Sequence, residues 1–219
     1  ERLGGEIRFS TRVEDILVEN GSIRGLSTHN LVNGQHEEVD ASQVVLAIGH
    51  SARDTFEMLH SRGVFVEPKA FSIGFRIEHP QGLIDRARFG NNDRYAGHPD
   101  KIVEHVGAAD YKLVYHAKNG RSVYSFCMCP GGTVVAATSE IGRVVTNGMS
   151  QYSRLERNAN AGIVVGIEPS DFGADSDNPL AGIGFQRNLE SGAFKLGGEN
   201  YFAPGQLVGD FLAGRASKE

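Results

Sequence analysis

The sequence has few cysteines and no long apolar run. Its two cysteines, Cys127 and Cys129, are too few for a disulfide framework. No apolar stretch approaches the ~18 residues of a membrane span, and no secretory signal peptide opens the chain. The formal net charge of −5 disfavours nucleic acid or an anionic membrane as the main partner. These absences predict a cytoplasmic protein.

Motifs that bind phosphate or metal are also missing. There is no Walker loop, and the Gly182-x-Gly184 in AGIGFQRN lacks the third glycine of a dinucleotide fingerprint and follows a predicted loop. The histidines are scattered, as at His50, His79 and His116, without H-x-x-x-H or H-E-x-x-H spacing. The sequence therefore predicts no metal site, and a phosphate site for any nucleotide must come from elsewhere.

The 219 residues, 40% of them apolar, are enough to bury a substantial core. The N-terminal part predicts a three-stranded antiparallel meander, because apolar alternations flank two Asn-Gly dipeptides. Asn-Gly is the strongest short hairpin signal, since both turn residues need a positive φ. The two dipeptides are Asn20-Gly21 and Asn33-Gly34.

A continuous apolar run at 44–48, VVLAI, follows the predicted meander. Because it does not alternate, it predicts a buried parallel strand that is covered on both faces. Gly49 predicts a tight turn, and Ser51 is the expected N-cap of a helix, with Asp54 completing a capping box. Gly63 suits the left-handed residue that ends such a helix.

The remaining residues predict a mostly antiparallel β domain followed by helices. Short strands are expected at 71–77, 111–116, 122–128, 133–138 and 162–167, a short helix at 81–90, and a surface loop at 91–100. Helices are expected after Asp177, with a buried stripe of Leu180, Ile183 and Leu189, and again after Pro204. The predicted domains are 1–63, 64–172 and 173–219.

The predicted strand tip at Gly49 is the first candidate site. In open parallel sheets, ligands lie beyond the carboxyl ends of the strands. The N–H groups of a helix that starts after Ser51 favour an anion or the polar edge of a heterocycle. The alternative is an ordinary turn that Gly49 permits, with His50 and Ser51 capping the helix.

The second candidate is YSFCMCPGGTVVAATSE, residues 124–140. In a strand, Cys127 and Cys129 share a face about 6.6 Å apart, at ~3.3 Å per residue, which is long for a disulfide. Three interpretations stay open: a strained redox pair, a thiol that faces flavin or substrate, and two small buried hydrophobes before a turn.

The stretch TNGMSQYSRLERNANAG at 146–162 is rich in amides, and three arginines lie in or near it. These are Arg143, Arg154 and Arg157. Such groups either bind a carboxylate or phosphate or close polar turns.

A meander followed by an apolar strand that ends at a glycine turn resembles the layout of FAD domains in the glutathione-reductase-like superfamily. Six segments in order resemble a bacterial family of largely uncharacterised FAD-dependent dehydrogenases: AIGHSARDTFEML, FSIGFRIEHPQ, FCMCPGGTVVAATSE, VVTNGMSQYSR, NANAGIVV and NYFAPGQLVGDFLAGR. The resemblance runs over nearly the whole chain. It implies an internal segment of a longer enzyme, with a GxGxxG unit before it and a second flavin-contacting stretch after it.

The fold that the resemblance implies is α/β (α+β). It joins the edge of an FAD-binding Rossmann-like domain, made of the meander and the buried parallel strand, to an inserted, mostly antiparallel β substrate domain and C-terminal helices. The implied function is part of an FAD-dependent oxidoreductase, with NAD(P)H as a candidate electron donor and an unknown small-molecule substrate. The segment alone is expected to be inactive and colourless. The alternatives are a non-catalytic scaffold or partner-binding domain and a flavin-dependent RNA-modifying enzyme.

The same resemblance assigns residues to these roles. Cofactor binding is assigned to Val13, Ile48, Gly49, His50, Ser51, Ala52, Gly131 and Gly132, with the Val13 backbone at the adenine end. Cys127 and Cys129 become the catalytic candidates, because the inserted domain is expected to cover the isoalloxazine ring.

Overall fold

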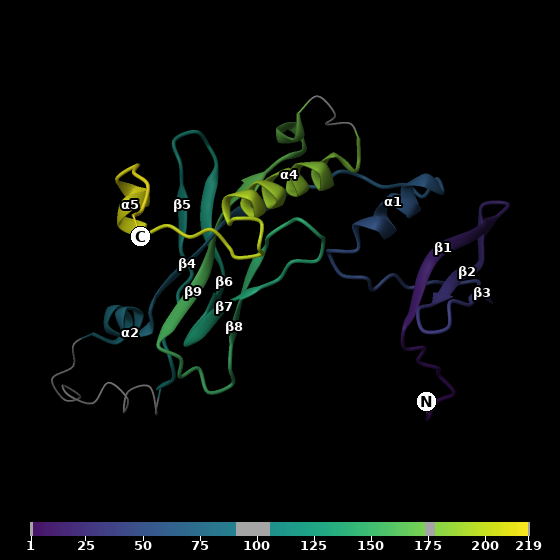
Figure 1. The fold of residues 1–219 in the computed structure, drawn as a ribbon, viewed down its shortest axis with the longest axis horizontal. Helices are drawn as coiled ribbons and strands as arrows, with labels where there is room; N and C mark the ends of the chain where they lie inside the picture. The colour runs from purple at the N-terminus through teal and green to yellow at the C-terminus, as the bar shows by residue number, and fades with distance from the viewer. Residues whose placement is uncertain (1, 91–105, 174–177, 219) are drawn as a thin grey trace. The chain divides into compact units, whose positions relative to one another are not determined.

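The computed structural model describes residues 2–90, 106–173 and 178–218. The chain divides into two compact units. The first unit comprises Glu1–Pro68 and Asp177–Ile183, and the second unit comprises Lys69–Ser176 and Gly184–Glu219. All strand pairings among the described residues are antiparallel, so the fold is mixed α and β with antiparallel sheets and few helices (Figure 1). None of the described helices is long and apolar enough to cross a membrane.

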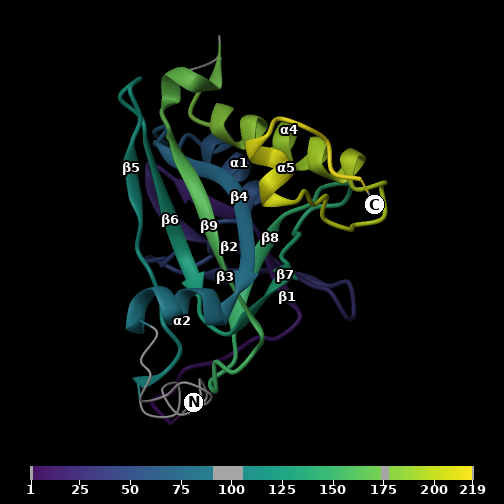
Figure 2. The ribbon, with the colours of Figure 1, turned by 90° about the vertical axis from the view of Figure 1, so that its left-hand side faces the viewer.

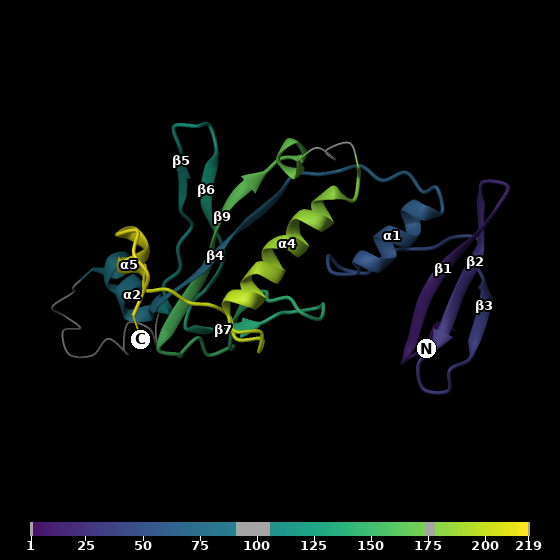
Figure 3. The ribbon, with the colours of Figure 1, turned by 45° about the horizontal axis from the view of Figure 1, so that its top comes forward.

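The first unit contains a three-stranded sheet, which confirms the predicted meander. Its strands are β1 (Thr11–Glu19), β2 (Ser22–Asn30) and β3 (His36–Asp40), in that order across the sheet (Figure 3). Asn20 and Gly21 form the first turn with φ values of 52° and 77°, the left-handed pair that a two-residue hairpin requires.

The second hairpin of this sheet has a longer loop than the Asn33-Gly34 dipeptide implies. The backbone N–H of Asn30 donates to the carbonyl of Gln35 at 2.8 Å, so residues 31–34 form the loop. The side-chain oxygen of Asn30 accepts the N–H of Val32 at 2.9 Å. Asparagine favours turns because its side chain can satisfy nearby backbone groups in this way.

The predicted buried parallel strand at 44–48 is wrong. Residues 43–49 form no strand, and Val45, Leu46 and Ile48 are 91%, 50% and 38% exposed. A strand forms when a neighbour satisfies its N–H and C=O groups. No strand is paired with this segment in the part of the chain that the structure describes. The structure therefore does not confirm a Rossmann-like sheet edge.

The helix after this segment is α1 (Arg53–Ser61), which begins without a side-chain cap. The predicted capping box is therefore wrong. The Ser51 hydroxyl instead hydrogen-bonds Nδ1 of His50 at 2.7 Å, and Oδ1 of Asp54 accepts the N–H of the residue that follows it. The predicted end of the helix is confirmed, since Gly63 adopts a φ of 78° directly after the C-cap residue Arg62.

The second unit is centred on a four-stranded sheet in the order β4-β9-β6-β5 (Figure 2). Its strands are β4 (Phe71–Pro80), β9 (Asn158–Ile167), β6 (Ser122–Cys129) and β5 (Val114–His116). A two-stranded ribbon of β7 (Gly132–Ala136) and β8 (Thr146–Ser150) accompanies it. The predicted strands of this region are confirmed, although β5 is shorter than predicted. No pattern predicts β8, because TNGMS has no apolar alternation.

The second unit contains the helices α2 (Gln81–Phe89) and α5 (Val208–Leu212), most of α4 (Ala181–Leu196), and a short 3-10 helix, η2 (Pro169–Phe172). The short helix predicted at 81–90 is confirmed as α2. The surface loop predicted at 91–100 lies outside the described residues. The predicted buried stripe is wrong, because α4 has no buried residue and Leu189 is 48% exposed.

Helices α4 and α5 contact the same face of β4 through aromatic rings. The ring centroid of Phe185 on α4 lies 6.2 Å from that of Phe71, and the ring of Phe211 on α5 lies 6.1 Å from that of Phe75. Phe71 and Phe75 share a face because side chains alternate along a strand. Arg76 therefore projects from the opposite face of the sheet.

An arginine joins the end of the sheet to η2. Arg121, just before β6, donates from Nη1 to the carbonyl of Gly166 at 2.8 Å and to Oδ2 of Asp171 at 2.9 Å. Its Nη2 donates to Oδ1 of Asp171 at 2.6 Å. These hydrogen bonds are the main cause that lowers the pKa of Asp171, and the backbone N–H of Glu168 lowers it further.

We expect Asp171→Asn to lower the free energy of unfolding at neutral pH, and the difference from the parent to vanish on acidification. The folded pKa of Asp171 lies below its unfolded value, so its stabilising contribution is present above about pH 4 and is lost as the pH falls through the folded value. Urea unfolding over a pH series measures this difference. Asp110→Asn, at an exposed aspartate of the same unit, is the control. A difference that persists at acidic pH would contradict the prediction.

Candidate functional site

One of the residues predicted to bind a cofactor in the first unit lines a small cleft. Val13 on β1 lines it together with Asp54, Thr55 and Met58 of α1, and its volume is about 240 Å³. Ala52 is the N-cap of the same helix, directly before the turn that lines the cleft. The structure therefore brings the predicted contact at Val13 to the beginning of α1.

An ion pair holds α1 beside β1. Nε of Arg62, just after the helix, donates to Oδ1 of Asp15 at 2.8 Å, and Nη2 pairs with the other carboxylate oxygen. The hydrogen bond from Arg62 lowers the pKa of Asp15, so the carboxylate is ionised at neutral pH. This ion pair therefore joins the end of α1 to β1.

The other predicted cofactor residues of the first unit lie in exposed chain. Ile48, Gly49 and His50 are exposed, and Ser51 is half-buried. Gly49 has a φ of 72°, a conformation that glycine adopts without strain, and the position of a Cβ there is open space. A ligand can therefore approach the Gly49 backbone closely. Whether these residues bind a cofactor stays a prediction.

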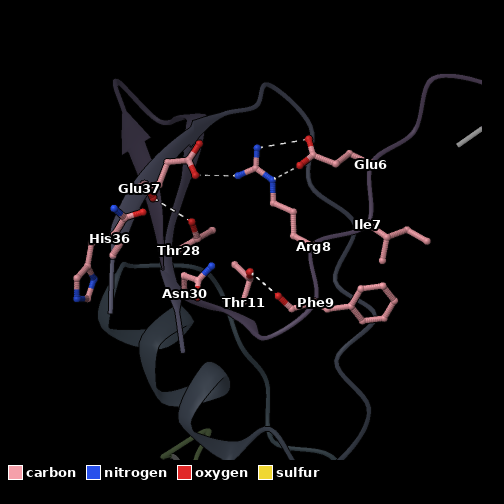
Figure 4. Close-up of a pocket in the computed structure, with 10 residues that line it drawn as sticks. Glu6, Ile7, Arg8, Phe9, Thr11, Thr28, Asn30, His36 and Glu37 are labelled. Carbon is pink, nitrogen blue, oxygen red and sulfur yellow. Dashed lines mark hydrogen bonds and ion pairs between the residues drawn. The ribbon is translucent and has the colours of Figure 1, made fainter. Parts of the chain in front are cut away.

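A second cleft of the first unit has a volume of about 730 Å³ and lies between the N-terminal segment and the meander (Figure 4). Arg8 donates to the carboxylates of Glu6 at 2.8 Å and Glu37 at 3.0 Å. Because two carboxylates compensate the charge of Arg8, the cleft does not favour a phosphate. The sequence analysis did not identify this cleft, which depends on how the N-terminal segment lies against β2 and β3.

A β-bulge separates the two cysteines of the second unit. Phe126 pairs with Gly162 and Cys129 pairs with Asn160, so β6 has one more residue than β9 between these pairs. Cys127 within the bulge has a φ of 48°, rare for a residue with a side chain. Cys127 is exposed and Cys129 is buried, and neither forms a disulfide. The predicted shared face is therefore wrong, because the extra residue reverses the alternation of side chains.

The two thiols also differ in their electrostatics. Burial raises the pKa of the Cys129 thiol, the neighbouring Cys127 raises it further, and Arg76 opposes both effects. Cys129 is therefore a neutral thiol at neutral pH, whose sulfur lies 3.4 Å from the carbonyl oxygen of Cys127. The thiolate is the nucleophilic form of a cysteine, and the buried Cys129 stays a thiol. Cys127 is exposed to solvent and is therefore favoured as the reactive cysteine.

Arg76 on β4 reaches across the sheet to this bulge. Its Nη1 donates to Oδ1 of Asn160 at 2.6 Å and to the carbonyl of Cys127 at 3.4 Å, and its Nη2 donates to Oδ1 of Asn147 at 3.3 Å. All of these acceptors are neutral. A guanidinium without a carboxylate partner among the described residues can bind a carboxylate or phosphate oxygen. We name Arg76, Cys127, Asn147 and Asn160 the arginine–asparagine cluster.

Asn160 is the most deeply buried side chain of this cluster. It is 0% exposed, and its Nδ2 has no hydrogen-bond acceptor in the described structure. A buried N–H without an acceptor costs about 1–3 kcal/mol. An acceptor atom that reached this Nδ2 would therefore be stabilised by the cluster.

Gly148 on β8 lets the ribbon approach the cluster. A Cβ at this position would overlap Oδ1 of Asn160 and Nη1 of Arg76, and it would lie 2.8 Å from Sγ of Cys129. The backbone of β8 therefore packs directly on these side chains. Asn147, the preceding residue, supplies one of the acceptors of Arg76.

The turn after Cys129 is held by side chains from elsewhere in the unit. Oε1 of the buried Gln81 accepts the N–H of Gly131 at 2.8 Å, and the hydroxyl of Ser150 donates to the carbonyl of Pro130 at 2.7 Å. Gly131 and Gly132 are both buried. Their lack of a side chain is explained by the backbone that packs against them, and cofactor binding by these glycines stays a prediction.

All three arginines considered in the sequence have structural contacts, and the carbonyl of Arg157 accepts the N–H of Gln81 at 3.0 Å. Arg143 pairs with Glu140 at 3.6 Å, and the carbonyl of Arg154 packs where a Cβ of Gly131 would lie. The cluster uses Arg76 instead, which the sequence analysis missed. The sequence feature that could have identified Arg76 is its position as a lone arginine among the apolar residues of FSIGFRI. Asn160 had no such signal, because an asparagine gives no indication of its burial.

Residues 70–219 match the model of a family described as "FAD-dependent protein, C-terminal domain-like". The match begins within one residue of the start of the second unit at Lys69, and it includes the whole arginine–asparagine cluster. An uncharacterised protein of Clostridium beijerinckii is 51% identical over 218 residues, which are 99% of this chain and 38% of that protein. The chain therefore spans less than two fifths of the length of this relative.

We expect Gly148→Ala to destabilise the second unit by about 1–3 kcal/mol, the usual cost of an overpacked methyl group. The added Cβ would push apart Arg76 and Asn160, or displace β8. Gly166→Ala is the matched control, because it adds the same atom on a strand where nothing lies within 4 Å. Denaturant unfolding compares the two variants. Equal stabilities would contradict the packing described here.

We expect a thiol reagent to modify one cysteine quickly and the other slowly. The fast one is Cys127, because it is exposed, whereas the buried Cys129 has a raised pKa. Stopped-flow labelling of the native chain measures the two phases. Cys127→Ser should remove the fast phase, and Cys129→Ser should keep it. Two fast phases in the folded parent would contradict this assignment.

Proposed function

Because the chain belongs to the FAD-dependent family whose C-terminal domain-like model it matches, we propose that it is a segment of a flavin-dependent oxidoreductase. The family match is the observation that supports the proposal, because the matched residues include the second unit and both cysteines. The finer form, an FAD-dependent dehydrogenase of the glutathione-reductase-like superfamily, rests on the resemblance of the six segments. The chain spans 38% of the length of its Clostridium relative. The oxidoreductase activity of a longer protein that contains this chain is therefore part of the proposal.

The first unit is better suited to bind one end of FAD than to bind the pyrophosphate group of FAD. Its cleft of about 240 Å³ is smaller than the ~300–1,000 Å³ of sites that enclose a whole small ligand. Glu14 and Asp54 line this cleft against a single guanidinium, that of Arg12, so their net negative charge repels phosphate. An adenine or a sugar beside Val13 suits the cleft, and the phosphate site then lies outside this chain.

Residues 48–52 would lie along the cofactor. The left-handed φ and open Cβ position of Gly49 give a flat ring access to the backbone. When bound, FAD supplies the hydride chemistry, and the protein orients it and excludes water. The exposed Val45 and Leu46 support the same proposal, since exposed apolar patches mark interaction sites.

The second unit would hold the substrate. The guanidinium of Arg76 would bind an anionic group, and Asn147 and Asn160 keep it in place from β8 and β9. The exposed thiol of Cys127 lies in the bulge whose carbonyl contacts the same guanidinium. Cys129 stays protonated behind the bulge, where its role is to fill the space under β8.

The test is a chimera in which this chain replaces the matching 218 residues of the Clostridium protein. We expect the purified chimera to be yellow and to release one FAD per chain on denaturation, while the isolated chain is colourless. A colourless chimera beside a yellow Clostridium protein would contradict the proposal, as would a Clostridium protein that binds no flavin. A yellow isolated chain would contradict the placement of the phosphate site outside it.

A pair of glycine variants locates the cofactor within the chimera. Gly49→Ala should weaken FAD binding at least about tenfold, which is ~1.4 kcal/mol, because its Cβ occupies the space of the ring. Gly34→Ala is the matched control, since Gly34 also has a positive φ, 73° against 72°, and open space at its Cβ position. Both variants carry the same backbone strain. Equal FAD affinities would exclude Gly49 from the cofactor site.

A further inference from the structure

Three side chains that can bind a metal lie close together on the meander, in a different unit from both cysteines. Oε1 of Glu14 lies 3.1 Å from Nδ1 of His29, and Oε2 of Glu14 lies 3.2 Å from Nδ1 of His36. The two imidazole rings are stacked, with centroids 4.3 Å apart and planes within 10° of each other. One ligand atom of each residue lies within 4.8 Å of the other two.

The strand register brings these residues together. His29 on β2 is paired with His36 on β3 and, on its other side, with Arg12 on β1. Glu14, two residues beyond Arg12, is the extra residue of a β-bulge in β1. A bulge redirects the side chain that it contains. The bulge therefore aims the Glu14 carboxylate at both imidazoles, each of which presents Nδ1 to it.

The three ligand atoms lie close enough for small side-chain rotations to bring them onto one ion. With bonds of ~2.1 Å, neighbouring ligand atoms of a tetrahedral ion lie about 3.4 Å apart, and here one ligand atom of each residue lies within 4.8 Å of the other two. We propose that Glu14, His29 and His36 form a binding site for a divalent transition metal of the Zn²⁺ class. Imidazole nitrogen and carboxylate oxygen are typical ligands of such ions, whereas Mg²⁺ and Ca²⁺ prefer oxygen ligands alone.

The site is accessible to an ion and leaves a position open. The His36 side chain is 61% exposed, and those of His29 and Glu14 are 24% and 29% exposed. Three protein ligands leave a fourth tetrahedral position for water or another ligand. His36 also lines the cleft of about 730 Å³ (Figure 4). The metal would join all three strands of the meander at this edge of the cleft.

Arg12 competes with the metal for the carboxylate. Its Nη2 donates to Oε1 of Glu14 at 2.6 Å, the same oxygen that contacts His29. The Arg12 side chain is 54% exposed, so its guanidinium can move into water when the metal takes this oxygen. The repulsion between guanidinium and metal lowers the affinity, and removal of Arg12 should therefore raise it.

The test is calorimetric titration of Zn²⁺ into the metal-free 219-residue chain, with the visible spectrum of Co²⁺ as a second readout. We expect one saturable site per chain and Co²⁺ bands typical of nitrogen and oxygen ligands. His29→Ala, His36→Ala and Glu14→Gln should each weaken binding at least about tenfold, since each removes a ligand. Arg12→Gln should tighten binding several-fold, a gain that unfolding cannot cause.

Two controls separate this site from other metal-binding groups of the chain. His116→Ala removes a histidine of the second unit that hydrogen-bonds Ser122, and it should leave Zn²⁺ binding unchanged. A thiolate-to-Co²⁺ band would assign the ion to Cys127 or Cys129 and overturn the proposal. Absence of saturable binding, or parent-like affinity in His36→Ala, would overturn it too. The titration needs no flavin, so its result is independent of the proposed function.

Discussion

The second unit depends on the pairing of β9 with two strands at once. β9 is hydrogen-bonded to β4 over the full length of both strands and to β6 on its other side. β4 and β9 are separated by more than seventy residues in the chain, so their pairing closes a long loop before any other contact can compensate its entropy. Once it has formed, β4, β6 and the turn after Cys129 are all positioned by β9.

The arginine–asparagine cluster follows from that pairing and from one irregularity in it. Gly162 lies between Arg76 on β4 and Phe126 on β6, so no β9 side chain separates them. The extra residue of β6 then turns a backbone carbonyl toward the guanidinium. The close approach of β8 at Gly148 covers these groups and buries Asn160. In a regular strand, Cys127 and Cys129 would lie on the same face, whereas the bulge leaves Cys127 exposed and Cys129 buried.

Local signals in the sequence could predict much of the fold. The turn at Asn20-Gly21, the end of α1 at Gly63 and the helix α2 follow from φ preferences and short-range patterns that no distant contact overrides. Bulges could not be predicted, because they are decided by the register between strands that are distant in sequence. Both sites depend on bulges, at Cys127 and at Glu14. His29 and His36 meet for the same kind of reason, since spacing along the chain does not reveal a cross-strand pair.

The apolar run at 44–48 shows the limit of pattern-based prediction in another way. Its composition indicates burial, yet Val45 is 91% exposed among the described residues. Burial of a valine or leucine side chain is worth about 1.5–3 kcal/mol, so this exposure forgoes stability that a neighbouring sheet could supply. The strands of both units make their β-sheet hydrogen bonds within their own unit, so the run at 44–48 adds no strand to either one. The family match begins within one residue of the start of the second unit. The exposed apolar run lies outside that match, in the first unit.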